Sequence, residues 1–216
     1  MARKAGASWE WFAALFALLS EAYLEPEADV GRRAASLAED ADSASGHHGA
    51  ALRSALAGMA ECRESPVERG TEFVRLFLHG AGNATAHPYE SVHRFGRLMA
   101  PECLSALSEL YEEAQIHPRA DLSVPPDHLG LELECLAYAL ANLGGAPAGS
   151  PEQRRWADLA FRMVSEHLEP FASNFSQKVE AAAPSPFYHW AGEALGLGLG
   201  ACRARLARLL PDAPED

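Results

Sequence analysis

The sequence lacks several features that would point directly to a function. Its four cysteines (Cys62, Cys103, Cys135, Cys202) are far apart, so no CxxC spacing for a metal or redox site exists. Its 18 basic residues against 30 acidic ones, a net charge of −12, argue against nucleic acid as a partner, because nucleic-acid binding depends on dense Lys/Arg contacts with phosphates. Outside residues 11–20 no run approaches the roughly 18 uncharged apolar residues of a membrane span, so no stable membrane insertion is expected.

The cysteines and the first apolar stretch indicate the cellular compartment in which the protein is expected. Cysteines placed inside helical patterns are interpreted as small buried hydrophobic residues in a reducing compartment. The apolar stretch at 11–20 lies between Glu10 and Glu21, and no small-residue cleavage site follows it, so it is interpreted as a helix and not as a signal peptide. A cytoplasmic protein is therefore expected.

Apolar residues recur at helical spacing along almost the whole chain, and no convincing alternating strand pattern interrupts them. Ser65-Pro66-Val67-Glu68 combines an N-cap serine, a proline at the first helical position and a glutamate that closes a capping box. Ser150-Pro151 and Ser185-Pro186 are similar helix starts. The sequence predicts an all-α fold, a single globular domain over residues 1–216 with roughly eight to ten helices.

Two irregular segments, residues 80–91 and 117–127, break the helical pattern, and they are the best places for a site in an all-helical chain. The second leads into Pro125-Pro126-Asp127-His128, directly before an apolar helical run. Asp127 is expected to cap that helix, which is worth about 1 kcal/mol, but capping does not explain His128. Glu132 lies four residues after His128 and is expected to hydrogen-bond it. An acidic rim beside apolar residues fits a peptide that is partly basic and partly hydrophobic.

Two other interpretations use the same residues. A helical metal-dependent hydrolase would use His128, Glu132 and a distant histidine such as His167, although two ligands on one helix face do not complete a tetrahedral site. No HExxH or GxSxG motif is present, and the glycines at 196–200 follow no strand, so close helix packing explains them better than phosphate binding. In the other alternative the chain is a helical scaffold, and Asp127 is only a helix cap.

Five segments in their order resemble the TorD/DmsD/NarJ family of molybdoenzyme maturation chaperones, over about residues 9–210. The segments are EFVRLF (72–77), HPYESV (87–92), PPDHLGLELECLAYAL (125–140), HLEPF (167–171) and PFYHWAG (186–192). The resemblance implies a cytoplasmic chaperone that is not an enzyme and has no cofactor of its own. It further implies binding of the twin-arginine signal peptide, or an equivalent N-terminal segment, of an apo molybdopterin oxidoreductase catalytic subunit. Such a chaperone assists cofactor insertion and delays export until folding is complete.

The resemblance also assigns site residues. Asp127 and His128 match the family's motif acid and histidine, Glu132 matches the trailing acid, and Pro88 and Tyr89 match the upstream proline-aromatic pair. Leu76 lies in the helix that contributes apolar groove contacts. Some members form domain-swapped dimers, so the resemblance implies a monomer or a swapped homodimer with a candidate hinge in the 117–127 loop. The chain lacks a P-loop, and no nucleotide site is predicted.

Overall fold

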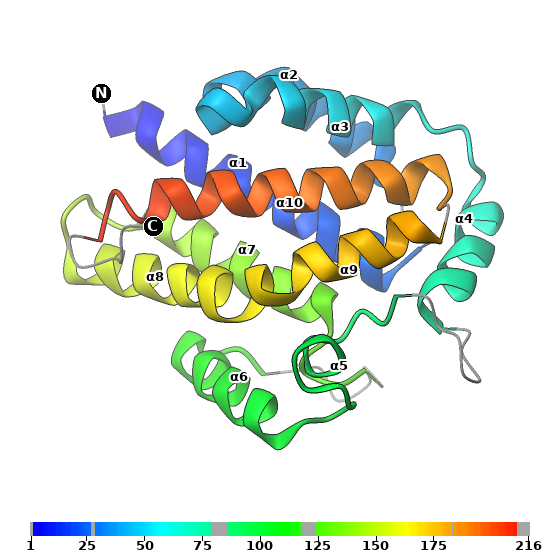
Figure 1. Ribbon diagram of the computed structural model, residues 1–216. Coiled ribbons are helices and arrows are strands. Elements are labelled where there is room, and N and C mark those ends of the chain that lie inside the picture. The colour runs from blue at the N-terminus through cyan, green and yellow to red at the C-terminus, as the bar shows by residue number, and fades with distance from the viewer. Residues whose placement is uncertain (1, 27–28, 79–85, 118–123, 183, 211–216) are drawn as a thin grey trace.

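The protein was analysed as a computed structural model that describes residues 2–26, 29–78, 86–117, 124–182 and 184–210 (Figure 1). Helices account for its secondary structure, and the described residues include no β-strand, so the all-α prediction is confirmed. The elements are α1 (Ala2–Leu24), α2 (Gly31–Ser45), the 3₁₀ turn η1 (Gly46–His48), α3 (Gly49–Glu61), α4 (Pro66–Phe73), the π-helical segment η2 (Val74–Leu78), α5 (Glu90–Phe95), α6 (Pro101–Ala114), α7 (Leu129–Gly145), α8 (Pro151–Arg162), the π-helical segment η3 (Met163–Leu168), α9 (Glu169–Ala181) and α10 (Pro186–Leu206).

The predicted helix starts are found where the capping residues stand. The backbone N–H of Glu68 donates to Ser65 Oγ at 3.3 Å, and the Glu68 carboxylate accepts from the Ser65 N–H at 2.8 Å, which is a complete capping box. Ser150 Oγ likewise accepts from the backbone of Gln153 at 3.0 Å at the start of α8. Each cap satisfies N–H groups that the first turn of a helix leaves without a partner.

Pro170 marks a helix boundary in the sequence, but the structure continues through it. The chain runs from α8 through η3 directly into α9, and Pro170 stands in the first turn of α9. A proline lacks the N–H that an interior helical position donates to the carbonyl four residues earlier, here that of Glu166, and this carbonyl accepts instead from Arg94 at 2.8 Å. The π-helical segment η3 ends two residues before the proline.

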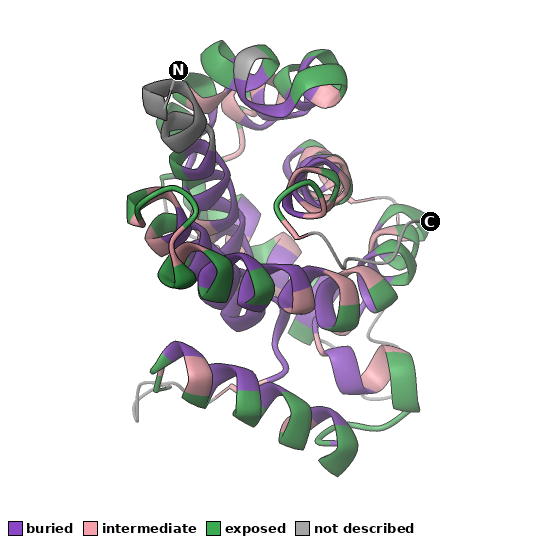
Figure 2. Cartoon of the chain, turned by 90° about the vertical axis from the view of Figure 1, so that its left-hand side faces the viewer, coloured by how far each residue is buried: buried purple, intermediate pink, exposed green. Residues whose placement is uncertain are grey.

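Helix α1 lies at the centre and packs along α7 and against α2 and α10. Helices α2 and α3 form the upper layer in Figure 1, α8 and α9 follow one another below α10, and the short helices α5 and α6 form the lowest layer. Figure 2 shows the buried residues on the helix faces turned toward one another. Aromatic rings from α1, η2 and α9 meet in the core, where Tyr23 contacts Phe77 and Phe175 with ring centroids 5.8 and 5.6 Å apart.

Several smaller predictions have clear outcomes. Close helix packing is found at Gly198, where an added Cβ would fall 2.9 Å from the Leu15 side chain, but not at Gly196 and Gly200, where an added Cβ would meet nothing within 4 Å. Helix α7 ends at Gly145, and Ala146 is its C-cap. None of the described helices has the length and apolar character that a membrane span requires. Much of both irregular segments, namely residues 79–85 and 118–123 with most of the candidate hinge, lies outside the described residues.

Candidate functional site

The two irregular segments that hold the predicted site residues meet in space. Tyr89 and His128 form an antiparallel bridge, in which the Leu129 N–H donates to the Pro88 carbonyl at 2.8 Å. The Glu90 N–H donates to the Asp127 carbonyl at 3.0 Å, and the rings of Tyr89 and His128 contact edge to face with centroids 5.2 Å apart. This junction, residues 86–91 paired with residues 124–129, brings together four of the six predicted residues.

Asp127 caps a helix, but a different helix from the one predicted. Its side chain is fully buried, and its Oδ2 accepts from the backbone N–H of Ser91 at 3.0 Å, in the first turn of α5. The prediction that Asp127 caps the helix that follows it is therefore wrong. The aspartate instead ties the start of α5 to the start of α7, two helices whose sequences are far apart.

His128 is the residue that caps α7. Its Nδ1 accepts from the Gly130 N–H at 3.1 Å, so the ring carries its proton on Nε2. Only 3% of the residue is exposed, and burial lowers the pKa of the imidazole to about 4. The histidine is therefore neutral near pH 7, as a cap on the positive end of a helix requires.

Glu132 is fully buried, and neither carboxyl oxygen has a hydrogen-bond partner among the described residues. The predicted bond to His128 is therefore absent. Burial, followed by the nearby negative charges of Glu90 and Asp127, raises the pKa of Glu132 well above its usual value. The protonated form of this carboxyl is therefore favoured more than in an exposed glutamate, and its unsatisfied polar atoms cost free energy.

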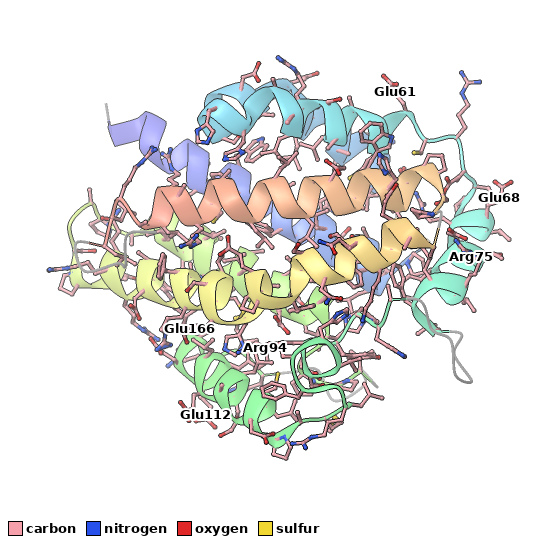
Figure 3. The ribbon with its side chains drawn as sticks, viewed as in Figure 1. Glu61, Glu68, Arg75, Arg94, Glu112 and Glu166 are labelled. Carbon is pink, nitrogen blue, oxygen red and sulfur yellow. The ribbon has the colours of Figure 1, made fainter. Side chains whose placement is uncertain are left out.

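Glu90 completes the buried polar cluster, and no pattern in the sequence indicated its role. Its Oε2 lies 2.9 Å from His167 Nδ1 and accepts from Cys103 Sγ at 3.1 Å, while Oε1 pairs with Arg94. Burial opposes ionisation of this carboxyl, but the hydrogen bonds from His167, Arg94 and Cys103 outweigh burial and lower its pKa. Arg94 also donates to the Glu166 carbonyl at 2.8 Å, which attaches α5 to η3 (Figure 3).

The six predicted residues differ in how accessible they are. Tyr89 is half-buried, and Val124, Pro125 and Pro126 in the junction are partly exposed. Leu76, Pro88, Asp127, His128 and Glu132 are buried, so the acidic rim expected at this place is not exposed. Leu76 is linked to the junction through its carbonyl, which accepts from the Ala86 N–H at 3.2 Å.

Comparison with known proteins gives the chain its family. A family model described as nitrate reductase delta subunit matches residues 38–177, more than half of the chain. The chain belongs to the nitrate reductase delta subunit family. Residues 87–140, which carry the junction and its PPDH motif, lie inside the matched range.

Relatives of this family member are named as chaperones. A chlorate reductase assembly chaperone protein from Ideonella dechloratans is 30% identical over 135 residues, which cover 62% of this chain and 68% of the relative. A chaperone protein TorD from Aeromonas salmonicida (strain A449) is 24% identical over 165 residues, covering 76% and 73% of the two chains. The resemblance to TorD-type chaperones is confirmed, and the chain is a chaperone and not an enzyme.

The metal-hydrolase alternative gains no support. Among the described residues no group of three His, Cys, Asp or Glu side chains is arranged to hold a metal ion. Nδ1 of His128 is occupied by a backbone N–H, and His167 is paired with Glu90. These residues instead hold helices of the delta-subunit fold to one another.

Proposed function

We propose that this chaperone binds the leader of a molybdopterin oxidoreductase catalytic subunit, either a twin-arginine signal peptide or an equivalent N-terminal segment. It acts in the cytoplasm, keeps the apoenzyme competent for cofactor insertion and delays export until folding is complete. The junction supports this proposal most strongly, because it pairs the two segments that family resemblance associates with leader binding. The names of the relatives, an assembly chaperone for chlorate reductase and TorD, support a client of the same kind.

The exposed residues of the junction contact the leader, and the buried ones support them. Tyr89 and the partly exposed Pro125 and Pro126 offer an aromatic and apolar surface to the hydrophobic part of a leader. The Asp127 side chain holds the two segments together by accepting from the Ser91 N–H, and the His128 side chain fixes the start of α7 by accepting from the Gly130 N–H. Leu76, Pro88 and Glu132 belong to the supporting layer beneath the same junction.

The test is calorimetric titration with a synthetic twin-arginine leader of a molybdopterin oxidoreductase from the same organism. Tyr89→Ala removes an accessible ring and is expected to weaken leader binding about tenfold or more, as truncation of an aromatic anchor does. Tyr138→Ala is the matched control, because Tyr138 is 46% exposed on α7 and contacts Trp156 rather than the junction. This control is expected to leave the affinity unchanged.

A second variant examines the supporting layer. Asp127→Ala combined with His128→Ala removes two caps, and it is expected to weaken leader binding while circular dichroism shows helicity largely retained. A folded double variant that binds the leader as tightly as the unaltered protein would overturn the assignment of this site. Light scattering of the same samples, with and without leader, distinguishes a monomer from a swapped dimer.

A further inference from the structure

The junction contains two consecutive prolines, and prolines restrict how a segment can be held in place. Proline has no backbone N–H, so the backbone of Pro125 and Pro126 can form hydrogen bonds only through its carbonyl groups. The Pro125 carbonyl accepts from the His128 N–H at 3.1 Å, which closes a turn within the segment itself. This bond shapes the turn, but it does not attach the prolines to another part of the fold.

Tyr111 supplies the attachment to another helix. Its hydroxyl donates to the Pro126 carbonyl at 2.7 Å, a bond that joins α6 to the junction across 15 sequence positions. Only 6% of Tyr111 is exposed, whereas Pro126 is partly exposed. The bond therefore connects the core to the surface that is proposed to contact the leader.

Helix α6 is itself fixed to the rest of the fold. Leu107 and Leu110 on this helix are buried in the hydrophobic core. Near its C-terminal end the Glu113 carboxylate accepts from the Arg162 guanidinium of η3's preceding helix, α8, at 2.6 Å. A donor that is already held in place loses little conformational entropy when its hydrogen bond forms. The tyrosine hydroxyl is therefore a fixed point from which the proline pair is positioned.

The bonds that pair the two segments of the junction begin after the prolines. Among the described residues, the Asp127 carbonyl accepts from the Glu90 N–H at 3.0 Å, and the Leu129 N–H donates to the Pro88 carbonyl at 2.8 Å. These bonds set the register of residues 127–129 and leave the preceding prolines to be held by other contacts. The hydroxyl of α6 supplies such a contact at Pro126.

We propose that Tyr111 is a positioning residue for leader binding, a role that rests on the proposed function of the junction. Its hydroxyl sets the position of the Pro125-Pro126 surface relative to the Tyr89 ring, so that both contact the apolar part of the leader together. Without this bond the proline pair is freer to move, and leader binding must then include the entropic cost of ordering it. Tyr111 is buried and acts through the prolines.

Tyr111→Phe removes the hydroxyl and keeps the ring, so it tests the bond without opening the core. Calorimetric titration with the synthetic twin-arginine leader is expected to show an affinity lower by about three- to tenfold, the range that one hydrogen bond can contribute. Tyr23→Phe is the matched control, because it removes a buried hydroxyl that has no hydrogen-bond partner among the described residues. This control should leave the affinity unchanged. An unchanged affinity in Tyr111→Phe, or an equal loss in both variants, overturns the role.

Rescue separates positioning from a general loss of stability. Tyr111→4-aminophenylalanine keeps a donor at the end of the ring and is expected to restore most of the affinity that phenylalanine loses. Ser150→Ala removes the N-cap of α8 and destabilises the fold outside the junction, so it is expected to leave the affinity unchanged. If the amine does not rescue binding, or if Ser150→Ala weakens it as much as Tyr111→Phe does, the positioning role is refuted.

Amide hydrogen exchange measures how firmly the prolines are held when no leader is present. The His128 N–H, which donates to the Pro125 carbonyl, is expected to exchange several-fold faster in Tyr111→Phe, while the Gln153 N–H at the start of α8 keeps its rate. An unchanged rate at His128 contradicts the role.

The failure of this role differs from the failure of the proposed function. If the unaltered protein binds no leader, or if Tyr89→Ala binds it with unchanged affinity, leader binding at the junction is wrong and the role of Tyr111 is wrong with it. If Tyr89→Ala weakens binding and Tyr111→Phe does not, the proposed function stands and only the role of Tyr111 is wrong.

Discussion

Replacing Glu132 by methionine is expected to stabilise the protein, although it alters a buried motif residue. The carboxyl group is fully buried without a hydrogen-bond partner, and an unsatisfied buried polar group costs about 1–3 kcal/mol. Methionine has a similar volume and no group that requires a partner, so the change should recover much of this cost.

The gain should grow with pH. The pKa of Glu132 lies well above 4.5 in the folded chain, while in the unfolded chain it is near 4.5. Between these two values the folded state holds a proton that the unfolded state has lost, so the stability of the unaltered protein falls as pH rises. The slope is about 1.4 kcal/mol for each pH unit across that window. Methionine does not titrate and removes this contribution.

Urea denaturation of both proteins at pH 5, 6 and 7 measures the difference, in which contributions from other titrating groups largely cancel. Glu134→Met is the control, because Glu134 is exposed on the same helix and should show no such pH-dependent gain. A Glu132→Met protein that is less stable at every pH, or a difference that does not grow from pH 5 to 7, would refute the reasoning. If the variant is stabilised but binds the leader poorly, Glu132 is kept for function at the expense of stability.

Three further predictions concern caps and the histidine. Asp127→Ala should cost about 0.5–2 kcal/mol in urea denaturation because the Ser91 N–H loses its acceptor, whereas Asp127→Asn should cost less because an amide oxygen can accept the same bond. The His128 ring should titrate near pH 4 when followed by NMR. Its contribution to stability is therefore complete above about pH 6.5 and is lost as the pH falls toward 4. A titration midpoint near pH 6.5 would contradict the buried cap. Ser65→Ala should cost about 1 kcal/mol, or a fall of about 2–4 °C in Tm, and Ser108→Ala on the exposed face of α6 should leave Tm unchanged.

Local signals in the sequence predicted most of the helices, and signals that depend on distant residues were missed. The capping box at Ser65 is complete within four residues, and it is found as predicted. Pro170 suggests a boundary because the local sequence does not reveal that Arg94, 72 positions from Glu166, supplies the donor that the proline cannot give to the Glu166 carbonyl.

The site shows the same division. The composition singled out two irregular segments, and the structure pairs them, but several of the partners of their side chains come from elsewhere in the chain. Asp127 caps a helix that begins at Glu90, and Glu90 pairs with His167, a residue 77 positions away. Adjacency in sequence suggested instead that Asp127 caps its own helix and that Glu132 bonds His128, and tertiary packing decided otherwise.

The bridge between Tyr89 and His128 makes the chain enter and leave the lowest layer at one point. Helices α5 and α6 therefore form an excursion from the central α1–α7 packing, and its two ends are joined by the bridge. Leu107, Leu110 and Tyr111 on this excursion belong to the hydrophobic core, and Glu90 pairs with His167, so replacing residues 90–127 by those of a relative would alter the core together with the lowest layer.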